Sequence, residues 1–545
     1  MKNIIKITFL SLTLVVALAL SASCTKWEEM NTDPYGLTTE MLQADYNNIG
    51  AYFPKLMQCV FYNYYNAAWD YQIISTIITD DWVGYMDCAQ KWGDGHYPPN
   101  LGENDNWTQA EWSYTYSNVF SPIATAIQPQ VEEAREGAAT GKFDHFYAPA
   151  LIIKVLAAHR LCDYYGPIIY THYGEEGVND PEFDSVKDAY YKFFEELDEA
   201  YGYLDTFVTE NPGQTPFANF DNWCGGDYNT WLKLCNSVRL RLAMHIVKVD
   251  PSKAKTEAEK AGASKYGFLE SYDVMESHDN WVHPNYTVTT WGNDTALGAV
   301  FESFMLGYND PRCEKMFSET TNAAALAAGQ KYWGFRLGWD PNVCTSEAYA
   351  GVSLFNTALK TLAGYIFSSA EAYFLRAEGA LRGWSGMGGS AKDLYEAGVT
   401  ASFKQWGVSG ADTYLAGTSL PTDYVDYANS QFSISAVNHL CVKWDESASK
   451  EEKLERIIDQ KYIAMWPESI EAWTELRRTG YPHQYPVMFN GSRGVLKDDE
   501  TPKRVCYKAA LQISNPQGYA GALSKLGGAD NMATPLWWDI EGSNF

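Results

Sequence analysis

Residues 228–249 read YNTWLKLCNSVRLRLAMHIVKV, and this stretch decides which fold the sequence predicts. Its apolar side chains recur at steps of three and four residues, with Arg239 and Arg241 on its flank, and it ends just before Pro251. That spacing is typical of an amphipathic helix, and a proline just beyond it is a typical stop signal. The same pattern predicts helices over residues 147–165, 186–204, 369–384, 391–406, 451–466 and 469–479.

Several of these helical stretches follow one another as pairs. A Gly-rich turn at residues 386–389 joins one pair, and Pro467 separates the members of another. The pair over residues 369–406 has about the length of the ~34-residue tetratricopeptide unit. Long runs of strict two-residue alternation, which would indicate strands, are almost missing. The sequence therefore predicts an all-α fold of tetratricopeptide-like helical hairpins.

Long stretches without helical periodicity lie between the predicted helices. They cover residues 82–118, 217–227, 271–295, 330–349 and 413–442, and they are rich in Trp, Tyr, Asn, Asp, Gly and Pro. Loops this long in a compact domain are usually functional rather than connective. We therefore expect a long-loop, irregular subregion beside the helical hairpins, and we expect it to carry the function.

The charge of the chain excludes two classes of partner. The sequence has 41 Lys and Arg against 68 Asp and Glu, which gives a formal net charge of −27 and an isoelectric point near 4.7. Salt-driven nucleic-acid binding needs a basic face, and so does docking on anionic lipid through basic residues. We expect neither. The hydrophobic share of 46% is also too high for a disordered chain.

The start of the chain has the pattern of an exported protein. Lys2 and Lys6 flank the beginning of a mostly apolar run, which ends in small residues before Cys24. Residues 1–23 are therefore predicted to be a signal peptide. The small residues with Cys24 resemble a bacterial lipobox, which would make Cys24 the lipid-attachment residue and residues 24–45 a tether to a single domain over 46–545. The alternative is ordinary cleavage near Cys24 without lipid.

Four widely spaced motifs resemble one family of bacterial surface proteins. Residues 220–248 contain aromatic-Gly-Gly-Asp and then N-S-x-R-L-R-L-A, residues 309–312 read N-D-P-R, and residues 369–384 read SAEAYFLRAEGALRGW. Residues 458–482 read IDQKYIAMWPESIEAWTELRRTGYP. In this order they resemble the SusD/RagB-like outer-membrane lipoproteins, and most closely the SusD-like branch with the R-R-T-G-Y-P signature. Residues 164–168 resemble the family's D-x-Y-G-D-I-P-Y turn, with an Asp missing.

The resemblance implies a fold, a location and a set of partners. It implies an all-α fold of tetratricopeptide-like pairs and a lipoprotein anchored in the outer membrane, facing outward. The usual partner is a SusC-like TonB-dependent transporter, and the usual ligand is an oligosaccharide or polysaccharide awaiting import. Most of the shared motif residues are expected to maintain the fold. The ligand residues of the family lie in variable loops without a motif, so none can be transferred by position.

The aromatic loops are the candidate ligand sites. Sugar recognition uses flat aromatic faces together with planar amide or carboxylate groups, and Trp and Tyr offer large contact areas. Three loops combine these residue types, although packing beneath a loop is the alternative fate for each Trp. The candidate residues are Trp82 and Trp92 in the first loop, Asn280, Trp281, Tyr286 and Trp291 in the second and preferred loop, and Trp333 and Trp339 in the third.

Sequence signatures of an enzyme or a cofactor site are mostly missing. There is no H-E-x-x-H, G-x-S-x-G or Walker A pattern, and the nine His have no metal-binding spacing. Asp94, Glu103 and Asp105 could hold calcium, but a solvated acidic loop explains them better. We therefore expect a binding protein without catalysis or cofactor. The rivals are a peptide-binding relative, a secreted glycoside hydrolase whose carboxylate pair no motif reveals, and a structural lid that acts only with its transporter.

Overall fold

The computed structural model describes residues 44–61, 67–88, 95–137, 141–175, 177–292, 294–340, 342–345 and 347–545. The predicted signal peptide, Cys24 and Trp92 lie outside these residues, as does Asp94. The chain divides into two compact units, residues 1–51 and 52–545. In the first unit the described elements are η1 (Ala44–Tyr46) and α3 (Asn47–Gly50). The fold that follows is that of the second unit.

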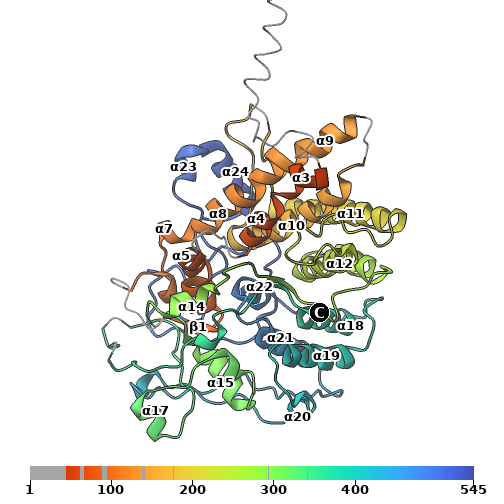
Figure 1. Cartoon of the computed structure of the whole chain (residues 1–545). Coiled ribbons are helices and arrows are strands. Elements are labelled where there is room, and N and C mark those ends of the chain that lie inside the picture. Colours follow the sequence, from red (N-terminus) through yellow and green to blue (C-terminus); the bar gives the residue numbers. More distant parts are fainter. Residues whose placement is uncertain are drawn as a thin grey trace, which may run out of the picture. The chain divides into compact units, whose positions relative to one another are not determined.

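Four helix pairs form the regular part of the second unit. Their bounds are α10 (Asp144–Tyr165) with α11 (Val186–Glu210), α12 (Tyr228–His245) with α13 (Pro251–Gly262), α18 (Ser369–Leu381) with α19 (Ala391–Gln405), and α21 (Lys450–Met465) with α22 (Ser469–Thr479). Contacts of α11 with α12, of α12 with α18 and of α18 with α21 join the pairs into a stack (Figure 1). The predicted all-α, tetratricopeptide-like fold is confirmed.

Polar side chains fix where six of these eight helices begin. In each case the residue before the first helical residue accepts a hydrogen bond from a backbone N–H of the first turn. Such a cap satisfies a donor that the helix itself leaves unpaired and is worth about 1 kcal/mol. The capping residues are Ser185, Asp227, Asp250, Ser368, Ser390 and Ser449. At the other end, Gly480 stops α22 with φ 84°, a conformation that glycine adopts easily.

Short helices make up most of the rest, and many of them lie beside the stack in Figure 1. From the N-terminal side they are α4 (Phe53–Cys59), α5 (Ala67–Tyr71), η2 (Gln72–Thr79), α6 (Asp80–Trp82), η3 (Pro98–Asn100), α7 (Asp105–Thr108), α8 (Ala110–Thr115), η4 (Tyr116–Phe120), η5 (Ile123–Ile127) and α9 (Gln128–Glu136). Later come α14 (Pro284–Thr289), α15 (Ala299–Gly307), α16 (Cys313–Met316), α17 (Ala323–Ala327), η6 (Thr357–Leu359), α20 (Ala411–Leu415), η7 (Ser430–Phe432), α23 (Leu511–Ser514) and α24 (Pro516–Leu526).

Two small antiparallel sheets hold the loop-rich part together. Strand β1 (Met86–Asp87) pairs with β3 (Ala296–Leu297), and β2 (Val274–Glu276) pairs with β4 (Gly364–Phe367). The region over residues 82–118, expected to be irregular throughout, contains α7, α8 and part of η4. These helices are too short to produce the long periodic pattern on which the prediction relied. Among the described residues, none of the helices combines the length and apolarity that a membrane crossing requires.

Buried ion pairs connect the helix pairs across the stack. Arg241 of α12 forms two hydrogen bonds of 2.7 Å with Glu371 of α18. Arg478 of α22 binds Glu378 of α18 in the same two-point manner, at 2.8 and 2.7 Å, and also reaches Glu475 at 2.6 Å. Burial by itself would raise the pKa of Glu378, but the neighbouring guanidinium groups outweigh it and lower this pKa to about 2. The motif arginines and glutamates therefore maintain the fold, as the sequence predicts.

We expect Arg478→Met to destabilise the protein by about 3–5 kcal/mol, because it leaves Glu378 and Glu475 buried without this cation. The control is Lys497→Met, which removes an exposed pair with Glu500 and should change the free energy of unfolding by less than about 1 kcal/mol. Urea-induced unfolding measures both. A cost for Arg478→Met no larger than that of the control would show that the buried pair does not hold the stack together.

Candidate functional site

Two tryptophans on neighbouring elements are open to solvent. Trp69 lies on α5 and has 51% of its surface exposed, and Trp291 lies two residues after the end of α14 and has 49% exposed. Helix α5 contacts α14, and both contact η2. A tryptophan exposed to this extent offers part of its ring to solvent, which is the arrangement that stacking on a ligand requires. We refer to Trp69, Trp291 and the residues around them on α5 and α14 as the tryptophan surface.

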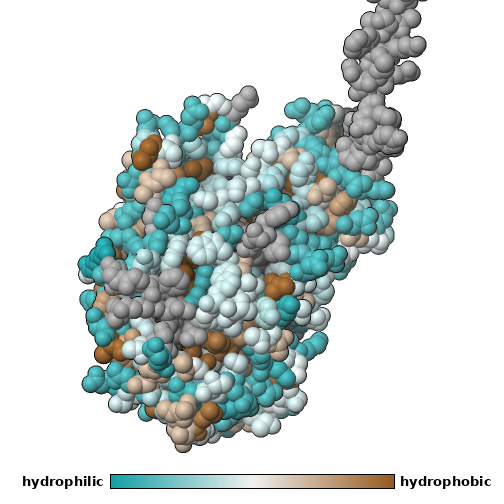
Figure 2. Space-filling model, turned by 60° about the vertical axis from the view of Figure 1, so that its left-hand side comes forward, coloured by the Kyte–Doolittle hydropathy of each residue, from teal (hydrophilic) through white to brown (hydrophobic). Residues whose placement is uncertain are grey.

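Polar and half-buried aromatic groups accompany this pair. Tyr286 on α14 is half-buried, and the ammonium group of Lys360 lies 5.4 Å from the centre of its ring. Asn280 is exposed, with φ 65°. Figure 2 brings the side with α5, α7 and α14 forward; its coloured atoms are mostly hydrophilic or near neutral, and the hydrophobic ones form small separate groups. Such a face suits a hydroxyl-rich ligand better than a large apolar partner.

Hydrogen bonds to buried residues fix the loop that carries Trp291. His283 caps α14 by accepting from the backbone N–H of Asn285 at 3.2 Å. The side chain of Asn285 accepts from the hydroxyl of Thr76 in η2 at 2.8 Å, and both residues are buried. The N–H of Trp291 donates to the carbonyl of Val288 at 2.9 Å. Helix α14 is therefore tied to η2, the segment that directly follows α5.

A second aromatic pair lies near the same segment. The rings of Tyr97 and Trp107 are 5.1 Å apart, and both residues are half-buried. Trp107 belongs to α7, which contacts η2.

Four of the predicted Trp residues are buried rather than exposed. Trp82 donates from its indole nitrogen to the carbonyl of Pro98 at 3.0 Å, and Trp281 donates to the carbonyl of Leu362 at 2.7 Å. Trp333 and Trp339 pack against Tyr349, with ring centres 5.8 and 5.6 Å away. Their faces are covered, which does not suit a stacking surface. Of the sequence-predicted residues, the structure leaves Asn280 and Trp291 exposed and Tyr286 half-exposed, and Trp92 lies outside the described residues.

Sequence reasoning missed Trp69. Residues 61–71 read FYNYYNAAWDY, an aromatic-rich stretch just before the apolar residues of η2. That density of aromatics was the available signal, but the stretch is short and lies outside the long polar loops. Next to Trp69, the carboxyl of Asp70 accepts from the hydroxyl of Tyr114 at 2.6 Å.

We expect Trp281→Ala to destabilise the protein by about 3–5 kcal/mol, because it leaves a cavity and an unpaired carbonyl at Leu362. Trp291→Ala removes a half-exposed ring from the same loop and should cost less than about 1 kcal/mol. Thermal unfolding of the two variants makes this comparison. Similar losses of stability in both would contradict the division of the loop into a buried and an exposed tryptophan.

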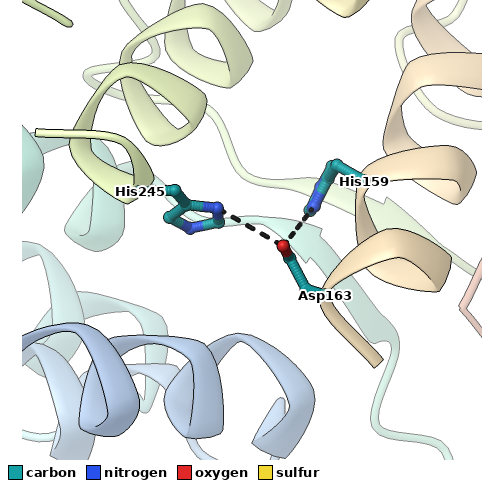
Figure 3. Close-up of side chains that lie close together, drawn as sticks. All are labelled: His159, Asp163 and His245. Carbon is teal, nitrogen blue, oxygen red and sulfur yellow. Dashed lines mark hydrogen bonds and ion pairs between the residues drawn. The ribbon is translucent and has the colours of Figure 1, made fainter. Parts of the chain in front are cut away.

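Groups that could bind a metal ion also lie in the helical core. Among the described residues, sets of three possible ligand atoms within 4.8 Å of one another are His159–Asp163–His245 and His245–Glu471–Glu475. Figure 3 shows His159 and His245 both directed at Asp163. Their Nδ1 atoms lie 3.5 and 3.4 Å from one carboxylate oxygen, while the other accepts from Tyr190 at 2.5 Å and Trp538 at 2.8 Å.

The close contacts between charged and titratable groups make this cluster a buried ion network. Burial disfavours a charged imidazole, but the carboxylates of Glu471 and Asp163 outweigh it and raise the pKa of His245 to about 9. A raised pKa favours the imidazolium form of His245, which suits its ion pairs with Asp163 and Glu471. Burial, aided by the nearby Arg241, lowers the pKa of His159. The cluster joins α10, α12 and α22 and belongs to the core.

We expect the raised pKa of His245 to make the protein less stable at alkaline pH. The stabilisation is complete below the unfolded pKa of about 6.5 and is lost as the pH rises through about 9. A shift of this size corresponds to about 3 kcal/mol. Urea unfolding of wild type and His245→Gln at pH 6 and pH 9.5 measures the effect. The wild type should lose more stability between these pH values than the variant, and equal losses would contradict the assignment.

Comparison with known proteins gives consistent matches along most of the chain. Residues 29–539 match the sequence model of the SusD-like family, described as Susd and RagB outer membrane lipoprotein. A chitin-binding SusD homolog from Flavobacterium johnsoniae is 37% identical, with a TM-score of 0.83 over 91% of this chain and 100% of the other. SusD homologs from Bacteroides vulgatus and Bacteroides uniformis are 34% and 32% identical, with TM-scores of 0.83 and 0.78 over 92% and 91% of this chain and 100% and 99% of theirs. Comparison with curated proteins gave no match.

Proposed function

The chain belongs to the SusD-like family of outer membrane lipoproteins, and from this premise we propose that it captures a glycan at the cell surface for import by a SusC-like TonB-dependent transporter. The observation that carries the proposal is the pair of half-exposed tryptophans, Trp69 and Trp291, on contacting elements. Half-exposed indole rings held by a packed base offer sugar rings a flat apolar surface without a loss of side-chain freedom on binding.

The ligand is best sought among neutral glycans. The net charge of −27 disfavours an anionic ligand through repulsion. One similar structure, the Flavobacterium johnsoniae homolog, is described as chitin-binding, and chitin is an uncharged polymer. We therefore propose oligosaccharides of chitin as the first ligands to test. The exposed amide of Asn280 offers hydrogen bonds to hydroxyl or acetamido groups beside the rings.

The mode of attachment follows from the start of the sequence. Residues 1–23 are proposed to be removed as a signal peptide, Cys24 to carry the lipid, and residues 24–45 to tether the domain over 46–545. Lipid on Cys24 would hold the protein at the outer membrane with the domain on the extracellular side. Each buried methylene of an acyl chain contributes about 0.8 kcal/mol to such an anchor. Binding is proposed to proceed without catalysis, as expected for a protein that delivers its ligand intact.

We expect Trp69→Ala and Trp291→Ala each to weaken glycan binding more than tenfold, equivalent to about 1.4 kcal/mol or more. Isothermal titration of the purified protein with a panel of oligosaccharides, including chitin oligomers, measures the affinity. Phe545→Ala is the control, because Phe545 is 43% exposed but lies beside Arg382, directly after α18, and Lys450 of α21. It should bind as the wild type does.

Other outcomes separate the rival functions. Unchanged affinity in both tryptophan variants, with the fold intact, would place the glycan elsewhere. Binding of peptides but of no glycan in the panel would favour a peptide-binding relative. Release of reducing ends from a bound polysaccharide would identify a glycoside hydrolase.

A further inference from the structure

A cavity of about 470 Å³ opens between the C-terminal end of α15 and helix α20. Its volume lies within the range of about 300–1,000 Å³ that is typical of small-molecule sites. In Figure 1 these two helices lie at the bottom of the view and α5 and α14 at the left, and no residue that lines the cavity belongs to the tryptophan surface. We call the cavity the hydroxyl pocket, after the side chains of Tyr308, Asn309, Ser409, Thr413, Tyr414 and Ser419 that line it.

The polar side chains of the hydroxyl pocket are all uncharged. Among the described residues that line it, there is no Asp, Glu, Lys, Arg or His, although these acids and bases without His make up 20% of the chain. A charged ligand would lose water there without gaining an opposite charge. Hydroxyl and amide groups both donate and accept hydrogen bonds. The lining therefore suits an uncharged ligand that carries many hydroxyl groups.

Four of these polar side chains are available to a ligand. Asn309, Ser409, Thr413 and Ser419 are all exposed. Over residues 294–340 and 347–545, which include the whole lining of the pocket, none of the four side chains forms a hydrogen bond with another protein group. Their donors and acceptors face water, so a ligand can take the place of that water without breaking a bond within the protein.

The N-D-P-R stretch at residues 309–312 contributes to both the fold and the pocket. Arg312 donates two hydrogen bonds to the carboxylate of Asp310, at 2.9 and 2.5 Å, and both residues are buried. Asn309 takes no part in this pair, and its backbone has φ 51°, a conformation in which Asn is much more frequent than most residues. The pair therefore maintains the fold, while Asn309 lines the pocket with an amide group.

Two buried tyrosines form the aromatic part of the lining. The hydroxyl of Tyr308 donates to the carbonyl of Leu440 at 2.8 Å, and that of Tyr414 donates to the side chain of Gln460 in α21 at 3.1 Å. The two rings meet edge to face, with centres 6.2 Å apart and an angle of 85°. Their hydroxyls are thus used within the protein, and the rings are held in place before any ligand binds.

The wall that contains Ser419 is fixed as closely. The backbone N–H of Thr422 donates to the carbonyl of Ser303 in α15 at 3.0 Å, and the hydroxyl of Ser303 donates back to the carbonyl of Thr422 at 2.5 Å. Gly307, the last residue of α15, permits this approach, because a Cβ atom there would collide with the carbonyl of Leu420. The hydroxyl pocket is therefore preformed between elements that are bonded to one another.

We propose that the hydroxyl pocket is a second saccharide site, which binds an uncharged mono- or disaccharide. Aromatic rings surrounded by hydroxyl and amide groups match the apolar and hydroxyl faces of a sugar ring. A cavity bounded by α15 and α20 takes a short saccharide or the end of a chain, whereas the tryptophan surface is open to an extended one. The inference rests on the proposed function for the class of ligand, and it adds a site and a size of ligand.

The test uses short sugars and a protein without the exposed tryptophans. Saturation-transfer NMR measures binding of N-acetylglucosamine and its β-1,4-linked disaccharide to the double variant Trp69→Ala, Trp291→Ala. Glucosamine and glucuronic acid are the charged counterparts. We expect the double variant still to bind the two neutral sugars, and to bind them more tightly than the charged ones.

Matched variants identify the pocket. Thr413→Val keeps the shape of the side chain but removes its hydroxyl, and Asn309→Gly removes the amide while tolerating the positive φ. Each should weaken binding of the neutral sugars about fivefold, the effect of one lost hydrogen bond. Thr418→Val is the control, because Thr418 is exposed close by but does not line the pocket. It should bind as the parent does.

Three results would overturn the proposal: no sugar bound by the double variant, equal affinity in Thr413→Val, Asn309→Gly and Thr418→Val, or tighter binding of a charged sugar than of the neutral ones. The failure of the proposed function has a different signature. If the tryptophan variants bind long glycans as the wild type does but the pocket variants lose the short sugars, the hydroxyl pocket stands and the tryptophan surface fails. If only the tryptophan variants lose affinity, the reverse holds.

Discussion

The buried arginine–glutamate pairs are the interaction on which the rest of the structure depends. Arg241 and Arg478 both reach carboxylates on α18, from α12 and from α22. Taking such charges out of water costs so much that the pairs add little net stability, but a wrong register would leave them unpaired at a cost of several kcal/mol. We infer that they act mainly by allowing one arrangement of the helix pairs. Packing of hydrophobic side chains between the helices would by itself permit several similar crossing angles.

The stack in turn positions the irregular part. Trp82 of α6 packs on Trp473 of α22, with ring centres 5.1 Å apart. Thr79 and Ser469 share a hydrogen bond of 2.7 Å, and the hydroxyl of Tyr85 donates to the carbonyl of Tyr462 at 2.5 Å. Residues 79–85, from the end of η2 to just before β1, are therefore attached to α21 and α22. Since α5 and α14 both contact η2, the tryptophan surface rests on the most regular part of the molecule, although its own elements are short.

The sequence predicts the helices well and the exposure of loop residues poorly, for one physical reason. Helical periodicity and capping residues act over neighbouring positions, so residues 228–249 or the cap at Ser449 can be recognised locally. Whether a tryptophan in a polar loop is buried depends on partners far along the chain. Trp281 and Trp291 have similar neighbours in sequence, yet the first is covered because its indole meets the carbonyl of Leu362. Nothing within the loop marks that difference.

The buried tryptophans and the exposed pair have complementary roles. A stacking surface is effective when its rings do not move on binding, and a ring cannot be held by a flexible loop alone. Trp281 packs against His283, the residue that caps α14, and the hydrogen bond between Asn285 and Thr76 holds α14 on η2. The aromatic residues of the chain thus have two roles. Most of them pack in the rigid interior, and a few present their rings to solvent. The neutral ligand proposed for this surface is consistent with the charge of the chain, because its binding need not overcome the negative charge of the surrounding protein.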